Sequence, residues 1–254
     1  MIPLKTKKQQ AIMRVGGKKL AGVMECVLAE VKPGVKLVDL DREAEKLIKK
    51  AGGRPSFKMV PSFSWASCLN LNEGVVHGVP SKKETKEGDL LSIDLGLFYQ
   101  GYHTDMSRSL LVGEDQSKDK ERFILTGKQV LNQAIGVAKS GNRIGHLSTV
   151  IESGLEKEGL FPVKDLTGHG IGKELHQKPN IPCFLDQSIE KTTLIEPGMA
   201  LAIEVIYTQK PARLEIEKDG WTVKTANGTL AGLFEDTILI TNEGVEVLTN
   251  SNKV

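Results

Sequence analysis

Residues 90–112 read LLSIDLGLFYQGYHTDMSRSLLV and carry a clear strand pattern. In the first half of this stretch, apolar residues alternate with small or polar ones, which is the period of a β-strand with one apolar face. The segment Tyr99-Gln100-Gly101 predicts a turn, so the second half would return as the other strand of a β-hairpin. A turn centred between Tyr99 and Gln100 would place Asp94 directly opposite Asp105, with Cβ atoms about 5 Å apart.

The two aspartates of this hairpin would lie on one face among small residues. Two carboxylates held together in a sheet repel each other, and burying them is costly unless a cation neutralises them. Asp94 and Asp105 therefore either share a proton or bind a metal ion, or they are two unrelated surface residues. All three interpretations are open from the hairpin alone.

The composition is that of a globular chain. A chain of 254 residues is long enough to bury a full core. Its net charge of +2 is too small to attract nucleic acid or an anionic membrane through overall electrostatics. We therefore expect no DNA partner and no membrane partner. The first twenty residues contain six basic side chains and no acidic one, which fits either a solvated helix start or a surface that docks transiently at the ribosome.

Features of export are missing from the sequence. The amino terminus, MIPLKTKKQQ, lacks the apolar centre of a signal peptide, and no uncharged stretch is long enough to span a bilayer. Cys26, Cys68 and Cys183 are odd in number and far apart, which fits a reducing compartment better than a disulfide framework. These features predict a cytoplasmic protein.

Helical periodicity surrounds the hairpin and repeats along the chain. It predicts helices over residues 12–31, 40–51 and 124–138, with loop and short strands over residues 54–80. Residues 141–159 then match residues 34–52 at a constant offset of 107. Residues 196–204 resemble residues 87–94, with Glu204 near the place of Asp94. The similarity predicts a duplicated helix–helix–strand unit, with chance similarity between amphipathic helices as the alternative.

The second half adds four residues that suit a metal centre. Leu166-Thr167-Gly168-His169-Gly170-Ile171-Gly172 surrounds His169 with glycines, which indicates a close approach of the backbone to another group. His176 follows seven positions later. Glu204 and Glu235 each interrupt a strand that is otherwise apolar, and a carboxylate in such a strand is rarely unpaired.

Four carboxylates and one imidazole carry too much negative charge for proton sharing. The set suits two divalent cations about 3.5–4 Å apart, joined by bridging carboxylates. Hard oxygen ligands with one nitrogen favour Mn, Fe, Co or Zn and do not select among them. A metal pair lowers the pKa of a bound water and polarises a carbonyl, which is the chemistry of a hydrolase.

These residues, in this order, resemble the methionine aminopeptidase family, type I, which has the pita-bread fold. The resemblance implies an α+β fold with two helix–helix–strand halves that are related by a pseudo-twofold axis. Together the halves would form a central curved antiparallel sheet covered by helices. The halves would be about residues 10–112 and 120–250 of one catalytic domain, residues 1–254. The matching segments are Asn72-Glu73, His77-Gly78-Val79-Pro80, Ile93-Asp94-Leu95-Gly96, His103-Thr104-Asp105, Gly168-His169-Gly170-Ile171-Gly172, His176, Pro197-Gly198-Met199, Glu204, Gly220-Trp221-Thr222 and Phe234-Glu235-Asp236-Thr237.

The resemblance also implies a role for each site residue. Asp94, Asp105 and Glu235 would bind one ion, whereas Asp105, His169, Glu204 and Glu235 would bind the other, and Glu204 would also be catalytic. The other catalytic residues, His77 and His176, would handle the substrate amide and the tetrahedral intermediate. The family removes the initiator methionine from nascent chains when the second residue is small, and it is usually monomeric. Peptides and nascent protein N-termini are therefore the expected partners.

By the same resemblance, Phe63, Cys68, Leu175 and Trp221 would line the methionine pocket, with ordinary apolar core as the alternative. The chain departs from the family near this pocket. The loop after Phe63 lacks the usual proline, and Leu175 stands where an aromatic residue is common. Two further departures lie beside the glutamates, at Val205 and Leu233.

Two other functions are compatible with the sequence. An Xaa-Pro aminopeptidase or dipeptidase shares the fold, but usually carries an additional amino-terminal domain, whereas the first helix here is expected by about residue 10. A non-catalytic pita-bread protein that binds peptide, protein or RNA would be expected to lose ligands, because buried carboxylates without a cation are unfavourable. All five ligand positions and both outer histidines are present here.

Overall fold

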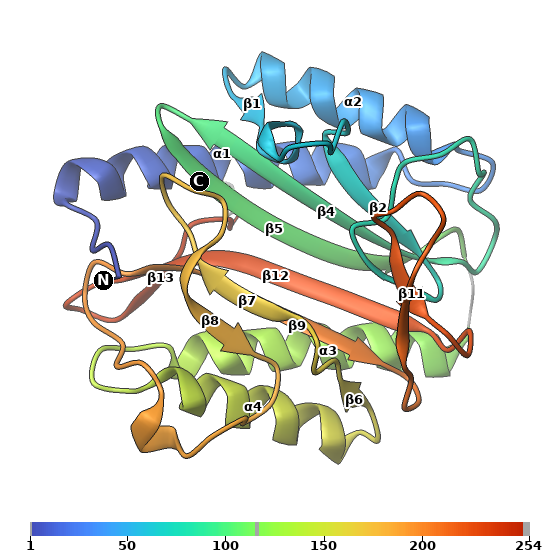
Figure 1. The fold of residues 1–254 in the computed structure, drawn as a ribbon. Coiled ribbons are helices and arrows are strands. Elements are labelled where there is room, and N and C mark those ends of the chain that lie inside the picture. Colours follow the sequence, from blue (N-terminus) through green and yellow to red (C-terminus); the bar gives the residue numbers. More distant parts are fainter. Residues whose placement is uncertain (1, 115–116, 251–254) are drawn as a thin grey trace.

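The protein is described by a computed structural model over residues 2–114 and 117–250, shown as a ribbon in Figure 1. The predicted domain limits at residues 1 and 254 lie outside the described residues. None of the helices in the described ranges combines the length and the apolar character needed to cross a membrane. Within these ranges the helices are α1 (Lys7–Ala29), α2 (Leu37–Lys50), α3 (Lys118–Val137) and α4 (Ile144–Lys157), with short 3-10 turns η1 (Phe57–Met59) and η2 (Ile189–Lys191).

The strands of the described chain form a ten-stranded sheet and a three-stranded sheet, and all of the strand pairs are antiparallel. The large sheet follows the order β1-β4-β5-β12-β9-β7-β8, with β2 paired to β4, β13 to β12 and β6 to β9, whereas β10, β11 and β3 form the small sheet. The bounds are β1 (Arg54–Pro55), β2 (Ser67–Leu71), β3 (Gly74–Val76), β4 (Leu90–Tyr99), β5 (Tyr102–Leu111), β6 (Phe161–Pro162), β7 (Thr167–Gly170), β8 (Gln177–Pro182), β9 (Ala200–Thr208), β10 (Leu214–Ile216), β11 (Val223–Thr225), β12 (Ala231–Ile240) and β13 (Val245–Val247).

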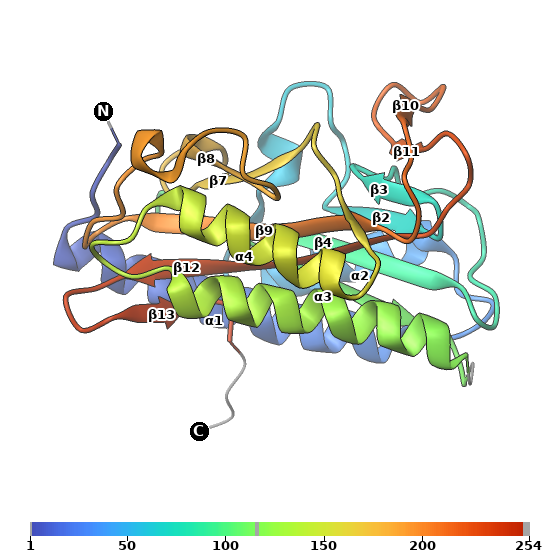
Figure 2. The same ribbon diagram turned by 90° about the horizontal axis from the view of Figure 1, so that it is seen from below.

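Each half of the chain has its own apolar core between helices and sheet. Residues such as Leu20 of α1 and Ile93 of β4 build the first core, and residues such as Leu147 of α4 and Ile203 of β9 build the second. Figure 1 shows α1 and α2 beside β4 and β5, and α3 and α4 beside β9. In Figure 2, α1 and α3 lie on one side of the central strands, and the β7–β8 and β10–β11 hairpins lie on the other side.

The predicted duplication is confirmed by the geometry of the two halves. Helices α2 and α4 both have 14 residues, and Leu37 corresponds to Ile144 at the offset of 107. Each helix follows a single β-bridge, formed by Lys36 with Glu84 in the first half and by Arg143 with Leu194 in the second. The repeated unit therefore includes the connection to the strand as well as the helix.

Equivalent glycines make the same turns in both halves. Before the second helix of each half, Gly34 and Gly141 have φ of 87° and 90°. After it, Gly52 and Gly159 have φ of 79° and 71°. Positive φ is strained for residues with a Cβ atom, so glycine is required at these matching turns.

The hairpin of residues 90–112 forms, but the predicted register is wrong by two residues. Asp105 lies opposite Gly96, and Asp94 lies opposite Ser107. The turn consists of Gln100 and Gly101, with φ of 47° and 92°, because a two-residue hairpin turn matches the strand twist when both central residues have positive φ. A shift of two residues keeps every side chain on its face, so Asp94 and Asp105 still lie on the same face.

The first helix is longer at its start than the apolar pattern predicts. It begins at Lys7 instead of residue 12, because Thr6 and Gln9 form a capping box that satisfies the first backbone N–H groups. It ends at Ala29, before Lys32-Pro33-Gly34. The second helix, predicted over 40–51, begins at Leu37 and ends at Lys50.

Candidate metal centre

Five adjacent strands of the large sheet each carry one of the predicted ligands. Across the sheet the strands follow the order β4, β5, β12, β9 and β7. In the same order, the side chains are Asp94, Asp105, Glu235, Glu204 and His169. Neighbouring strands are only about 4.8 Å apart, so residues from both halves of the chain converge at the centre of the sheet.

Three of the acids are aligned by strand pairing. Glu235 of β12 lies directly opposite Glu204 of β9, and on its other side it lies opposite Ser107 of β5. Ser107 also lies opposite Asp94 of β4. The Ser107 hydroxyl donates a hydrogen bond to Glu235 Oε2 at 3.2 Å, so this small polar residue separates Asp94 from the two glutamates.

The other two predicted ligands lie in a second row, separated by small residues. Asp105 lies opposite Gly96, and its backbone N–H donates to Thr237 Oγ1 at 2.8 Å. Thr237 pairs with Ala202, which pairs in turn with His169. The small residues Thr237 and Ala202 therefore lie between the carboxylate and the imidazole in this row.

The three most buried members of the group can hold one ion. Asp105, His169 and Glu235 each offer a ligand atom, and these atoms lie within 4.8 Å of one another. The Nδ1–H group of His169 donates a hydrogen bond to the carbonyl oxygen of Gly170 at 3.0 Å. The Nε2 atom then keeps its lone pair and lies 3.4 Å from Glu204 Oε1, as expected of a metal-binding histidine oriented by a backbone carbonyl.

The donor set fits a cation and does not fit a hydrogen-bonded polar cluster. Asp94 Oδ1 and Glu235 Oε1 are buried oxygen atoms with no hydrogen-bond partner among the described residues. Buried oxygens without a donor are rare in folded proteins, because they lose the hydrogen bonds of water. A bound cation would supply the missing partner for these oxygens.

Burial also makes the ionised forms of these acids unfavourable without a cation. Burial raises the pKa of Asp94 from 3.8 to about 7. The pKa values of Asp105, Glu204 and Glu235 are raised well above the usual range, first by burial and then by the neighbouring carboxylates. Burial lowers the pKa of His169 to about 3, which keeps the imidazole neutral and able to bind a metal.

An arginine that the sequence patterns did not predict as a site residue joins the two strands that meet at the centre of the sheet. Arg108 Nη1 donates to the carbonyl oxygens of Ser107 at 2.9 Å and Glu235 at 2.6 Å. Arg108 Nη2 donates to Asp236 Oδ1 at 2.8 Å, and Thr249 donates to the same oxygen at 2.6 Å. The isolated basic residue of the strand MSRSLL was the available indication of this role.

A pocket of about 130 Å³ lies above the five ligands. All eleven site residues expected from the sequence line it. Three further apolar residues, Phe57, Val60 and Val76, line it too and were not predicted, since they come from short segments without a periodic pattern. The pocket therefore has an acidic floor and apolar walls.

The two outer histidines lie at the mouth of this pocket. Both His77 and His176 are exposed, whereas His169 on the floor is 7% exposed. The rings of His169 and His176 meet edge to face, with centroids 4.5 Å apart. His77 has φ of 56°, which is uncommon for a residue with a Cβ atom and is a feature of functional sites.

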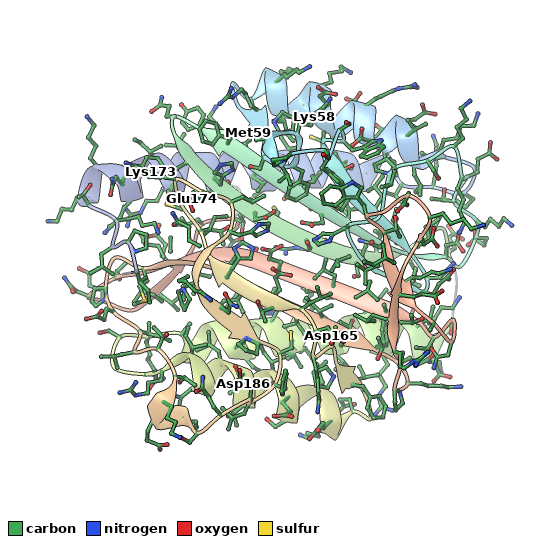
Figure 3. All side chains as sticks on the ribbon, in the orientation of Figure 1. Lys58, Met59, Asp165, Lys173, Glu174 and Asp186 are labelled. Carbon is green, nitrogen blue, oxygen red and sulfur yellow. The ribbon has the colours of Figure 1, made fainter. Side chains whose placement is uncertain are left out.

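Aromatic rings form one wall of the pocket. The ring of Phe63 has its centroid 5.1 Å from that of Trp221 and 5.2 Å from that of Trp65, in edge-to-face contacts. Figure 3 shows charged residues on two segments flanking the site, Lys58 on η1 and Glu174 in the loop between β7 and β8.

Comparison with known proteins agrees with this geometry. Residues 11–242 match metallopeptidase family M24. Methionine aminopeptidase 1 of Bacillus subtilis (strain 168) is 36% identical over 249 residues, which cover 98% of this chain and 99% of the relative. The methionine aminopeptidase of Clostridium perfringens is also 36% identical over 249 residues, with the same coverage.

Solved structures show the same fold. The crystal structure of methionine aminopeptidase from Thermotoga maritima has a TM-score of 0.94 and 36% identity, and covers 98% of this chain and 100% of that chain. A prolidase from Pyrococcus furiosus shares the fold at a TM-score of 0.78 and 24% identity, but the match covers only 66% of the prolidase. The chain therefore belongs to metallopeptidase family M24 and, within it, to the methionine aminopeptidases of the pita-bread fold.

Proposed function

We propose that this chain is a metal-dependent aminopeptidase that removes the N-terminal methionine from peptides and nascent proteins, preferring a small second residue. The observation that carries the proposal is the convergence of four carboxylates and one imidazole below an apolar pocket. The names of relatives that are 36% identical over nearly the whole chain support it. We expect the enzyme to act in the cytoplasm.

The proposed cofactor is a pair of divalent cations. As the family resemblance implies, Asp94, Asp105 and Glu235 would hold one ion, and Asp105, Glu235, His169 and Glu204 would hold the other. Carboxylate ligands with one imidazole suit Mn, Fe, Co or Zn. When bound, such ions lower the pKa of water and polarise a substrate carbonyl.

The side chains around the pocket would move the protons of the reaction. The Glu204 carboxylate lies on the pocket floor, where it would accept a proton from the attacking water once a bound cation keeps it ionised. It would then return this proton to the leaving amine nitrogen. From the mouth, His77 and His176 would donate hydrogen bonds to the scissile amide and to the oxyanion of the tetrahedral intermediate.

The apolar walls suit a methionine side chain. Phe63, Leu175 and Trp221 line the pocket with Cys68, and Phe63, Leu175 and Cys68 are buried. Methionine is unbranched and its thioether makes favourable contacts with aromatic rings, so it can fill an irregular apolar pocket. A charged or polar side chain would lose its hydration there without gaining a partner.

The test is hydrolysis of Met-Ala-Ser, Leu-Ala-Ser and Ala-Pro-Ser by chelator-treated protein, with Mn²⁺ or Co²⁺ added back. We expect metal-dependent release of methionine, at least about 10-fold faster than release of leucine, because an apolar pocket discriminates such side chains to this degree. Cleavage of Ala-Pro-Ser would instead support a proline-directed peptidase. No cleavage of any peptide would favour a non-catalytic binding protein.

The outer histidines should affect turnover without affecting metal binding. Replacing His77 or His176 with alanine should lower kcat about 100-fold, because each would remove a donor that stabilises the transition state. The metal content of both variants should equal that of the wild-type protein. His146→Ala, on α4 and far from the pocket lining, is the matched control and should keep full activity. Loss of metal in either variant would make that histidine a metal ligand.

Transient docking at the ribosome is a second proposal, and it rests on fewer charges than the sequence implies. Lys5 is buried, Arg14 pairs with Glu246 at 2.8 Å, and Lys19 Nζ donates to the carbonyl oxygen of Ala51 at 2.5 Å. Lys7, Lys8 and Lys18 are exposed on the first helix. Co-sedimentation with ribosomes across a salt series tests the proposal, since binding through these lysines should weaken as salt increases.

A further inference from the structure

A buried carboxylate on α2 holds a segment that lines the pocket. Asp41 is 6% exposed, and its Oδ1 atom accepts three hydrogen bonds. The donors are the backbone N–H groups of Ala66 and Ser67, both at 2.9 Å, and the Ser67 hydroxyl at 2.8 Å. Hydrogen bonds to a charged group are stronger than those between neutral groups, so this contact defines the local backbone position.

The held segment contributes much of the apolar wall. We call residues 56–67 the aromatic segment, because it carries Phe57, Phe63 and Trp65. Phe57 and Phe63 line the pocket, and so does Cys68, the next residue after the segment. The position of the aromatic segment therefore determines the shape of the pocket.

The first end of the aromatic segment is also anchored. The backbone N–H of Ser56 donates to the carbonyl oxygen of Gly96 at 2.9 Å. Lys58 forms an ion pair with Glu45 at 3.0 Å. Glu45 lies one helical turn beyond Asp41 on α2, so the two acids share a helix face and hold the two ends of the segment. The Glu45 pair is partly exposed and contributes less than the buried Asp41.

Between these anchors, the backbone hydrogen bonds donated by residues 59–63 stay within the aromatic segment in the described chain. Val60 donates to Phe57 at 2.9 Å, and Phe63 donates to Val60 at 3.2 Å. Ser62 has φ of 68°, a left-handed conformation that serine does not favour. The middle of the segment thus depends on local turns, and its placement against the sheet depends on the two ends.

The second half of the duplicated chain has no equivalent of this carboxylate. The position 107 residues after Asp41 is Ser148, which is also buried. The position equivalent to Glu45 is Glu152, which accepts a hydrogen bond from the Leu185 backbone N–H at 3.0 Å. Both halves therefore use a glutamate as an anchor, whereas Asp41 occurs only in the half that has the aromatic segment.

We propose that Asp41 is a positioning residue that determines side-chain selectivity by fixing the aromatic segment in the pocket wall. Asp41 does not line the pocket, so it acts through Ala66 and Ser67 on Phe63 and Cys68. The selectivity part rests on the proposed aminopeptidase function. The placement of the segment by Asp41 does not, and it can be measured separately.

Tryptophan fluorescence of the metal-free protein measures that placement without any catalysis. The chain has two tryptophans, Trp65 and Trp221, and both contact the ring of Phe63. Asp41→Ala should shift their emission to longer wavelengths and increase quenching by acrylamide, because the segment loses its anchor. Asp41→Asn keeps an acceptor oxygen and should restore most of the wild-type signal. Asp39→Ala is the matched control, since Asp39 lies on the same helix and its side chain pairs with the exposed Arg42 in the described part of the chain.

Kinetics measure the selectivity part of the proposal. Asp41→Ala should raise KM for Met-Ala-Ser about 10-fold, the amount expected from loss of a hydrogen bond to a charged group, and change kcat less than about 3-fold. The ratio of methionine release to leucine release should fall. Ser67→Ala removes one of the three donors and should give a smaller effect in the same direction, which keeps the proposal testable if Asp41→Ala does not fold.

Two fluorescence results would overturn the proposal. One is wild-type emission and quenching in folded Asp41→Ala, and the other is failure of Asp41→Asn to restore them. If wild-type protein cleaves no peptide with either metal, the proposed function fails, whereas the fluorescence comparison still decides the positioning role. If the fluorescence changes as expected but selectivity does not, Asp41 places the segment without determining selectivity, and the proposal is wrong.

Discussion

Glu235→Gln is expected to lower kcat/KM at least about 1,000-fold and to weaken binding of divalent cations. Glu235 lies at the centre of the ligand row, directly opposite Glu204, and its Oε1 atom has no partner in the described structure. Removing one charge about 4 Å from a cation costs roughly 4 kcal/mol at the effective dielectric of a protein, which corresponds to about three powers of ten in rate. Peptide hydrolysis and titration calorimetry with Mn²⁺ measure the two effects.

Two controls separate loss of a ligand from loss of the fold. The metal-free Glu235→Gln protein should be at least as stable as the metal-free wild type, because the amide is neutral at every pH and cannot add a buried charge to the other acids. Glu246→Gln, on the neighbouring strand β13, removes only a partly exposed ion pair with Arg14 and should keep activity. Full activity of Glu235→Gln would contradict the two-metal proposal.

Removing the metal should make stability fall as pH rises from about 7 to about 8.5. In this range the histidines are largely neutral in the folded and unfolded states, and the unfolded carboxyl groups are already ionised. The folded protein keeps protons on the buried acids, because burial raises the pKa of Asp94 to about 7 and those of Asp105, Glu204 and Glu235 further. The folded state then binds more protons than the unfolded state, so the free energy of unfolding decreases with pH.

One carboxyl group that stays protonated across this window accounts for about 2 kcal/mol of the decrease. The free energy of unfolding in urea, determined for chelator-treated protein at both pH values, measures this decrease. Saturating Mn²⁺ should abolish or reverse the trend, because the cation and the protons compete for the same oxygens. A stability that does not change with pH in metal-free protein would show that the acids ionise without a cation.

Local pattern was sufficient for much of the fold. The alternation in residues 90–112 predicts a hairpin, and the helical spacing predicts three helices to within a few residues at most ends. The fourth helix, α4, lies within residues 141–159, which match residues 34–52. The offset of 107 predicts the duplication, because each turn of the repeated unit needs a glycine at the same place. These features depend on side-chain period and backbone conformation over a few residues, and both are visible in the sequence.

Local pattern was not sufficient for the pairing of strands. The register of the hairpin depends on whether Gln100 adopts positive φ. Positive φ is uncommon for residues other than glycine, so the sequence alone did not indicate it. The predicted register was therefore wrong by two residues, although the faces were right because strand side chains alternate with a period of two. The cap at Thr6 was missed because a capping box lies outside the apolar pattern.

The types of the ligand residues, and their occurrence in apolar strands or among glycines, were visible in the sequence. Their convergence was not, since the pairing of Glu204 with Glu235 and the role of Ser107 between Asp94 and Glu235 come from the order of strands in the sheet. Asp41 shows the limit clearly, because in the sequence it is one more acid on a helix. Packing of α2 against the aromatic segment buries the Asp41 carboxylate and brings three hydrogen-bond donors to one of its oxygens. Such contacts depend on the whole fold rather than on residues nearby in the sequence.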